Sequence, residues 1–327
     1  MAGVGLLVAA AVIAALWLGG SGPPPSGPKA AATLPGLAAS AASAAPAASA
    51  APATSAAGSL RASPSPSPSP SPSPSSAGPG QRQDPLGTAA ASYLAGRTGT
   101  VLAAVSDLRT GQTWYLGRGQ PQDEASVVKL DVLETLLAEQ DRSGTGLSAT
   151  DQELAGQMIE DSDNNAATSL WDQVGGAGGI GSFNTAAGLT GTTPSSCVNC
   201  PGFPWPGWGL STTTPADQLA LLRVLVEPNS ALTATERSYA LSLMENVTPD
   251  QRWGVSAGVP AQATVALKNG WLPLDSAADD WQINSVGWIS GRGRDYLMAV
   301  LSTGNPTEQY GIDTISQLAA MVWDGLA

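Results

Sequence analysis

Apolar and polar positions beyond residue 99 follow the two periods of regular secondary structure. Residues 100–105 alternate as a strand does, residues 109–112 have the composition of a turn, and residues 113–117 resume the pattern, so a β-hairpin is predicted. From residue 126 to residue 139 the apolar residues recur at helical spacing instead. The pattern therefore predicts a helix shortly after the hairpin.

Capping signals mark the starts of further helices. Thr150 and Glu153 have the spacing of a capping box. Thr214 is expected to cap a helix whose first position is Pro215. The helices expected here are residues 150–161, 165–174, 215–226, 233–246 and 311–326. Residues 175–209 are rich in glycine and proline and are expected to form a loop.

Three strands are expected late in the chain, at residues 264–267, 283–289 and 296–302, with a turn at 291–294 between the last two. The order is thus strands, a block of helices, strands and a final helix. This order predicts an α/β (α+β) fold, in which both ends of the domain complete one antiparallel sheet and a helical subdomain is inserted between them.

The first 83 residues differ in composition from the rest. Residues 1–20 contain the apolar run 4–18, which is typical of a signal peptide or a signal anchor. Residues 21–83 are built from Ala, Ser, Pro and Gly with a Ser-Pro repeat, and we expect a disordered linker there. Residues 84–327 form the predicted domain. We therefore expect export, with the domain secreted or anchored to the membrane at the cell envelope.

The net charge of the chain is −12, and all 26 acidic residues lie beyond residue 83. Such an acidic domain argues against nucleic acid and against anionic lipid as its main partner. The chain also contains no histidine. A Ser-His-Asp triad is therefore excluded, and any serine nucleophile needs another group to take its proton.

Lysine is the candidate for that group. Ser126 and Lys129 lie three residues apart at the start of a predicted helix, which places them on one face. The helix dipole would stabilise negative charge developing at Ser126. Lys129 can act as a base only when neutral, which requires burial and a nearby positive charge. Lys268, the other lysine beyond residue 83, is the candidate for that charge.

Three short motifs occur in order along the domain, namely Ser126-Val-Val-Lys129, Ser162-Asp-Asn164 and Lys268-Asn-Gly270. Together they resemble the penicillin-recognising serine enzymes, the class A β-lactamases and D,D-peptidases, whose pattern is S-x-x-K, S-D-N and K-T-G. The order of predicted elements resembles this family from residue 86 to residue 327.

The resemblance implies a role for each motif. Ser126 would be the nucleophile and Lys129 its base, and Ser162 would relay a proton to the leaving nitrogen. The backbone N–H groups of Ser126 and Trp271 would form the oxyanion hole.

Substrate binding is implied for the remaining motif residues. Asn164 would hold the substrate amide, and Lys268 would attract its carboxylate, with Asn269 and Gly270 beside it.

The sequence departs from the family pattern in three ways. Residues 173–216 contain no Asp or Glu, so the glutamate that frees the acyl-enzyme in class A enzymes is missing. The 36 residues from Ser126 to Ser162 are fewer than a class A enzyme has, which predicts a trimmed helical subdomain. Asn269 replaces the usual Thr or Ser. A carboxylate-binding arginine is not identified, and Arg252, Arg292 and Arg294 are the candidates.

Cys197 and Cys200 are the two cysteines of the chain, and a local disulfide is the leading interpretation in an exported protein. A metal site is disfavoured because other soft ligands are lacking. The aromatic cluster Phe203, Trp205 and Trp208 is either a loop core or a hydrophobic lid over the cleft.

The sequence thus predicts an exported active-site-serine hydrolase acylated by β-lactams or by D-Ala-D-Ala-like peptides of peptidoglycan. The alternative is a slow-turnover penicillin-binding protein, or a non-catalytic cell-wall interaction protein on the same fold. No cofactor is implied, and we expect a monomer.

Overall fold

The computed structural model describes residues 82–117, 120–200, 206–229, 231–274 and 279–327. The predicted signal or anchor (1–20) and almost all of the predicted linker (21–83) lie outside the described residues, as do Phe203 and Trp205. Within the described part of the chain, no helix has both the length and the apolar character needed to cross a bilayer.

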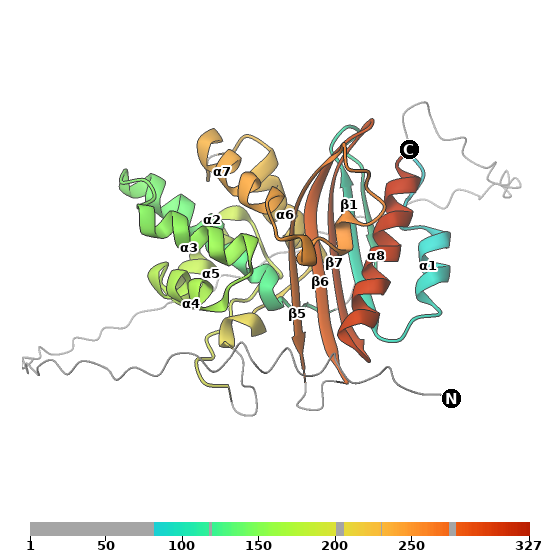
Figure 1. The fold of residues 1–327 in the computed structure, drawn as a ribbon, viewed down its shortest axis with the longest axis horizontal. Helices are drawn as coiled ribbons and strands as arrows, with labels where there is room; N and C mark the ends of the chain where they lie inside the picture. Colours follow the sequence, from blue (N-terminus) through green and yellow to red (C-terminus); the bar gives the residue numbers. More distant parts are fainter. Residues whose placement is uncertain (1–81, 118–119, 201–205, 230, 275–278) are drawn as a thin grey trace, which may run out of the picture. The chain divides into compact units, whose positions relative to one another are not determined.

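A five-stranded antiparallel sheet in the order β2-β1-β7-β6-β5 forms the centre of the domain (Figure 1). Its strands are β1 (Thr100–Asp107), β2 (Thr113–Leu116), β5 (Thr264–Pro273), β6 (Trp281–Gly291) and β7 (Arg294–Asn305). β1 pairs with β7, from Thr100 opposite Thr303 to Asp107 opposite Tyr296. The prediction that both ends of the domain complete one antiparallel sheet is therefore confirmed.

Both faces of this sheet are covered by helices (Figure 1). α8 (Glu308–Gly325) and α1 (Thr88–Leu94) lie on one side. The inserted subdomain lies on the other and contains α2 (Val128–Ser143), α3 (Ala149–Glu160), α4 (Asn164–Gln173), α5 (Gly176–Ala187), α6 (Pro215–Val226) and α7 (Ala234–Glu245). A two-stranded ribbon of β3 (Gln122–Asp123) and β4 (Thr212–Thr213) joins the two parts.

The central strand β7 contributes to the core on both of its faces. Leu297 and Ala299 pack in the cluster that includes the helical subdomain, whereas Met298 and Val300 pack in the cluster that includes α8. Successive side chains of a strand point to opposite faces, so a strand covered on both sides must be apolar at every position. This arrangement explains the continuous apolar run of β7.

The predicted N-caps of α6 and α7 are confirmed, whereas that of α3 is wrong. α6 begins after Thr214 with Pro215 at its first position, and α7 begins after Thr233, as predicted. The cap of α3 is Ser148, whose side chain accepts from the Asp151 N–H. The predicted Thr150 cap is wrong because Ser148 and Asp151 form an equivalent reciprocal pair two residues earlier.

The largest departure from prediction is α5, which lies in the stretch expected to be a loop. Its sequence is rich in glycine, which disfavours helix on intrinsic grounds. Ile180 and Phe183, three residues apart, are both buried against the subdomain core. Tertiary packing therefore overrides the local propensity, and Gly175 and Gly188, both with positive φ, bound the helix.

The helix α2 is buried along its first three turns, from Val128 to Ala138. Asp131 and Glu134 are therefore inside the protein rather than on a solvated face, and Glu124 is buried just before the helix. Burial is the main cause that raises the pKa of Asp131 to about 7 and the pKa of Glu134 well above its usual value. The two ion pairs among the described residues, Arg82–Asp107 and Arg223–Glu227, involve none of these three carboxyls.

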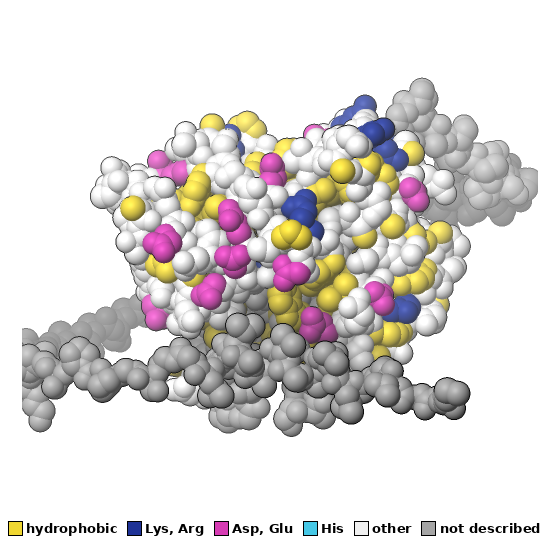
Figure 2. Space-filling view, viewed as in Figure 1, with side chains coloured by type: hydrophobic (Ala, Val, Ile, Leu, Met, Phe, Trp, Pro, Cys, Tyr) yellow, Lys and Arg dark blue, Asp and Glu magenta, His cyan; other side chains and the backbone are white. Residues whose placement is uncertain are grey.

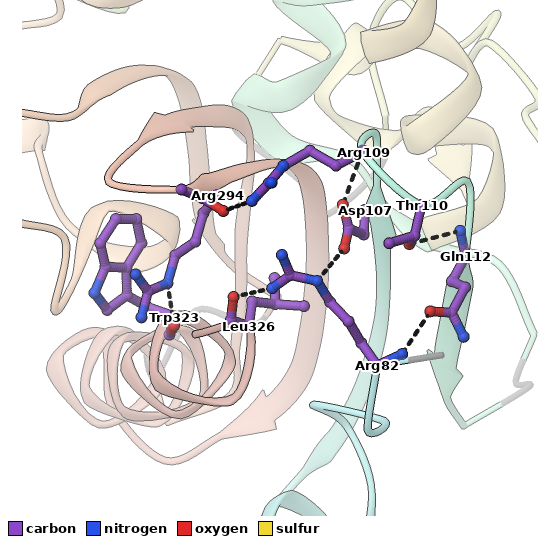
Figure 3. A network of polar contacts seen from close by, with 9 residues as sticks. Arg82, Asp107, Arg109, Thr110, Gln112, Arg294, Trp323 and Leu326 are labelled. Carbon is purple, nitrogen blue, oxygen red and sulfur yellow. Dashed lines mark hydrogen bonds and ion pairs between the residues drawn. The ribbon is translucent and has the colours of Figure 1, made fainter. Parts of the chain in front are cut away.

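The first described residue, Arg82, is joined to the sheet by polar contacts (Figure 3). Its Nε lies 2.9 Å from Oδ2 of Asp107, a side chain only 3% exposed, and its backbone N–H donates to Oε1 of Gln112 at 2.9 Å. Its guanidinium also donates to the carbonyl of Leu326 near the end of the chain. Figure 2 shows basic side chains gathered at this end of the sheet, whereas acidic ones are scattered over the rest of that face.

We expect Asp131→Asn to stabilise the protein more at pH 8 than at pH 4. Because its folded pKa is raised, Asp131 contributes stability that is fully present below about pH 4 and is lost as the pH rises through about 7. The loss amounts to up to about 4 kcal/mol. Thermal unfolding should give a Tm difference between variant and parent that grows by up to roughly 8–16 °C over this range. The exposed Asp141→Asn serves as control, and a pH-independent difference at Asp131 would contradict the interpretation.

Arg82→Ala should destabilise the domain by about 1–3 kcal/mol, because it leaves the buried Asp107 carboxylate without its ion-pair partner. Circular dichroism should record a Tm lower by roughly 3–8 °C. Arg292→Ala, at an exposed arginine that bonds neutral Gln262, should change the Tm little. Equal melting of the two variants would show that the Arg82 contacts add no stability.

Candidate active site

Ser126 lies in a short 3-10 turn, Ala125–Val127, that leads into α2. It therefore precedes the α-helix, whereas the sequence predicted that Ser126 lies within the first helical turn. The turn is fixed by the Asn284 side chain, which donates to the carbonyls of Asp123 and Glu124, each at 2.8 Å. Ala125 has a φ of 49°, an unfavourable value for a residue with a Cβ, so the surrounding structure imposes the conformation of this turn.

The edge strand β5 runs directly against this turn. A Cβ on Gly270 would lie 2.7 Å from the backbone N of Ser126 and 2.9 Å from the carbonyl O of Glu124. Only glycine permits so close an approach of the strand to the backbone of the nucleophile turn. The backbone at Gly270, directly before Trp271, is thereby placed beside the Ser126 amide, while the joint oxyanion hole of Ser126 and Trp271 stays a prediction.

The Lys129 side chain extends from α2 to the connection between α3 and α4. It is fully buried, and its Nζ donates to the carbonyl O of Ser162 at 2.6 Å, to Oγ of Ser162 at 3.0 Å and to Oδ1 of Asn164 at 2.8 Å. Ser162 has a φ of 56°. In this left-handed conformation the carbonyl and the hydroxyl of Ser162 both accept hydrogen bonds from Lys129.

Lys268 reaches the same hydroxyl from the sheet. Its Nζ is 3.0 Å from Oγ of Ser162 and 2.9 Å from the carbonyl O of Asn269, and its side chain is also fully buried. The Ser162 hydroxyl thus lies between two lysine nitrogens. All three sequence motifs are brought together at this oxygen.

Burial disfavours the charged forms of both lysines, and repulsion from Lys268 adds to this effect at Lys129. The pKa of Lys129 is lowered well below its usual value, first by burial and then by Lys268, with Asp163 opposing the shift. Burial lowers the pKa of Lys268 to about 7. The structure therefore supplies the two conditions that a neutral Lys129 requires, namely burial and a nearby positive charge.

The predicted nucleophile Ser126 and its predicted base Lys129 are not hydrogen-bonded to each other in this structure. Among the described residues the Ser126 hydroxyl has no hydrogen-bond partner. The donors of Lys129 are directed to Ser162 and Asn164 instead. Proton transfer from Ser126 thus requires Lys129 or Ser126 to shift, as catalytic hydrogen bonds often do when substrate binds.

The Asn269 side chain contacts backbone carbonyls of the protein itself. It is buried, and Nδ2 donates to the carbonyls of Gln251 at 2.7 Å and Trp253 at 3.2 Å. Neighbouring strand residues point to opposite faces, so the direction of Lys268 toward Ser162 turns Asn269 away from it. Its amide therefore holds the loop beside β5 in this structure, and a contact of Asn269 with substrate stays a prediction.

The candidate arginines make contacts away from Ser162. Arg294 stacks on Trp323 of α8, with its guanidinium carbon 4.2 Å from a ring centroid (Figure 3). Arg292 donates to Gln262, and Arg252 donates to the carbonyl of Glu245 at 2.7 Å. The described residues hold no group of three or more His, Cys, Asp or Glu side chains placed to bind a metal ion.

The connection between α5 and α6, which we call the disulfide loop, carries a disulfide and a buried tryptophan. Cys197 and Cys200 are joined in a disulfide. Gly207 lies against them, since a Cβ there would overlap the carbonyl of Cys197 at 1.6 Å. Trp208 follows in a 3-10 turn (Gly207–Leu210), is 7% exposed, and places a ring centroid 5.1 Å from Nζ of Lys129. The sequence suggested a loop core or a lid for the aromatic cluster, and it did not predict that Trp208 lies beside Lys129.

Comparisons with known proteins find a family model, a lipoprotein and several β-lactamases. A family model described as the beta-lactamase enzyme family matches residues 139–326, a stretch that contains Ser162 and Lys268 and begins after Lys129. The protein named lipoprotein LppW of Mycobacterium tuberculosis is 28% identical over 224 residues, covering 67% of this chain and 68% of its own. Beta-lactamase Toho-2 of Escherichia coli is 28% identical over 242 residues, covering 70% of this chain and 75% of its own.

Solved structures share the fold. The extended-spectrum β-lactamase TLA-1 aligns with a TM-score of 0.65 at 19% identity, over 74% of this chain and 98% of that one. A class A β-lactamase from Mycobacterium abscessus aligns with a TM-score of 0.59 at 24% identity, over 72% of this chain and 96% of that one. The α/β fold with an antiparallel sheet flanked by helices is thus that of class A β-lactamases. Since the family model covers more than half of the sequence, this chain belongs to the beta-lactamase enzyme family.

Proposed function

We propose that this chain is an exported active-site-serine hydrolase that is acylated at Ser126 by β-lactams or by peptides that end in D-Ala-D-Ala. The observation that carries the proposal is the position of the Ser162 hydroxyl, 3.0 Å from Nζ of both Lys129 and Lys268. A hydroxyl that bridges an amine of lowered pKa and a second lysine is suited to moving a proton from a nucleophile to a leaving group.

Acylation involves Ser126, Lys129 and Ser162 in sequence. Oγ of Ser126 attacks the substrate carbonyl carbon, and its proton passes to the neutral amine of Lys129. The backbone N–H groups of Ser126 and Trp271 stabilise the oxygen of the tetrahedral intermediate. The C–N bond then breaks, and the leaving nitrogen takes a proton from Ser162, which regains one from Lys129. The acyl group remains on Ser126.

Substrate binding is assigned to the other polar groups of the cleft. Lys268, when protonated, attracts the carboxylate that β-lactams and D-Ala-D-Ala peptides share. Asn164 uses Oδ1 to accept from Lys129, so its Nδ2 is the atom that binds the substrate amide carbonyl. β5 has a strand partner only on its β6 side among the described residues, which leaves its other edge for the amide backbone of a substrate.

A second candidate function is a penicillin-binding protein with slow turnover. Residues 173–216 contain no Asp or Glu, so that stretch supplies no carboxylate to activate water against the acyl-enzyme. This observation favours slow release of the acyl group. A non-catalytic cell-wall interaction protein on the same fold is the remaining alternative, and it predicts no covalent adduct.

The place of action that we propose is the outer side of the cell envelope. The apolar run at residues 4–18 has the length of a signal segment. The relative LppW is named as a lipoprotein, which supports an envelope location for this chain as well.

Incubation of the protein with benzylpenicillin should produce an adduct whose added mass is that of one intact penicillin molecule. Intact-protein mass spectrometry followed over time measures both its formation and its loss. Ser126→Ala should abolish the adduct completely, whereas Ser169→Ala, at an exposed serine of α4, should leave it in place. Absence of an adduct in the parent protein at millimolar penicillin would reject acylation by this substrate and favour the interaction protein.

The acylation rate should depend on pH through both lysines. Acylation needs Lys129 neutral and Lys268 protonated, so the rate should rise as Lys129 loses its proton and fall above about pH 7 as Lys268 becomes neutral. Stopped-flow absorbance with a chromogenic cephalosporin measures this profile. Lys268→Arg, which stays charged, should remove the alkaline fall in any variant that retains parental thermal unfolding. Persistence of that fall would exclude Lys268 as its source.

A further inference from the structure

Trp208 covers the side of Lys129 that faces the disulfide loop. A ring centroid lies 5.1 Å from Nζ, and the side chain is 7% exposed. Its only polar atom, Nε1, donates to Oγ1 of Thr168 on α4 at 3.1 Å. The surface that the indole presents to Lys129 is therefore an aromatic face with no conventional hydrogen-bonding atom.

The position of Trp208 is fixed by backbone contacts on both sides. The Ser211 N–H donates to the carbonyl of Trp208 at 3.0 Å, and the carbonyl of Ser211 accepts from the Glu124 N–H at 2.7 Å, two residues before the nucleophile. Oγ of Ser211 accepts from the Ser195 N–H at 2.9 Å. The turn that carries Trp208 is thus tied to the turn that carries Ser126, so the ring is built into the site.

Hydrolysis of an acyl group on Ser126 requires a water molecule beside a base. The water oxygen must bond to the acyl carbon while the C–Oγ bond breaks, one water proton must go to a base, and Oγ must receive a proton. Lys129, the proposed base of acylation, is a group able to take and return that proton. Its Nζ is surrounded by Ser162, Asn164 and the indole of Trp208.

We propose that Trp208 excludes the hydrolytic water from the Lys129 side of the acyl-enzyme, so that the acyl group is released slowly. The proposal rests on the acylation of Ser126 proposed above. It assigns to Trp208 a positioning role, because the ring acts by denying water access to Lys129 and does not itself react. The disulfide loop, which lacks a carboxylate, thus places an aromatic ring beside the base.

The test compares how long the penicillin adduct survives in Trp208→Ala and in Trp208→Phe. Excess penicillin is removed after acylation, and intact mass is followed over time. The deacylation rate constant should rise by roughly 10²-fold in Trp208→Ala, the lower end of what access to a general base contributes. Trp208→Phe keeps a ring over Lys129 and should release the acyl group about as slowly as the parent. Trp114→Ala, on the opposite sheet edge, is the matched control.

A pH profile separates water access from general loosening. In Trp208→Ala, deacylation should accelerate as Lys129 loses its proton, whereas loosening of the fold alone predicts no such dependence. Equal adduct lifetimes in Trp208→Ala and the parent would overturn the inference and leave acylation intact, as would rapid release by the parent. Failure of every protein to form the Ser126 adduct would instead overturn the proposed function. Thermal unfolding and the yield of adduct confirm that each variant is folded.

Discussion

The contact of one hydroxyl with two buried lysines is the constraint around which this site is built. Two fully buried ammonium groups so close together are unstable, because each loses hydration and each repels the other. Ser162 supplies an oxygen that both nitrogens share, and its carbonyl supplies a second acceptor to Lys129. The unfavourable φ of Ser162 is part of the cost of this arrangement. Burial is the first cause that lowers the pKa of each lysine, and it brings that of Lys268 to about 7.

This contact dictates how the two parts of the fold must meet. Lys129 comes from α2, Ser162 from the connection between α3 and α4, and Lys268 from β5, so the helical subdomain and the sheet must be held in fixed register. Gly270 lets β5 approach the backbone of Ser126, and Asn284 on β6 holds the turn before it. The sheet therefore does more than bury apolar surface, since its edge carries one lysine and shapes the nucleophile turn.

The sequence predicted the elements that depend on local signals and missed those that depend on tertiary packing. Thr214 caps α6 as expected, because a side-chain cap and a following proline act locally. Helix α5 was missed because Ile180 and Phe183 stabilise it only against distant core residues. The three motifs predicted the two lysines and Ser162 correctly as neighbours. The direction of Asn269 could not be predicted, since it depends on which face of β5 meets the helices.

Buried carboxyls near the nucleophile do not replace the base that the disulfide loop lacks. Glu124 lies two residues before Ser126, yet burial first and Asp131 second raise the pKa of its carboxyl well above the usual value. Burial also keeps this carboxyl away from solvent water, since its side chain is 0% exposed. Its further neighbours Thr213 and Asp217 belong to β4 and α6, so the carboxyl faces the interior of the subdomain. The sequence distance to the nucleophile is thus misleading, and the chemistry of release is determined by what surrounds Lys129.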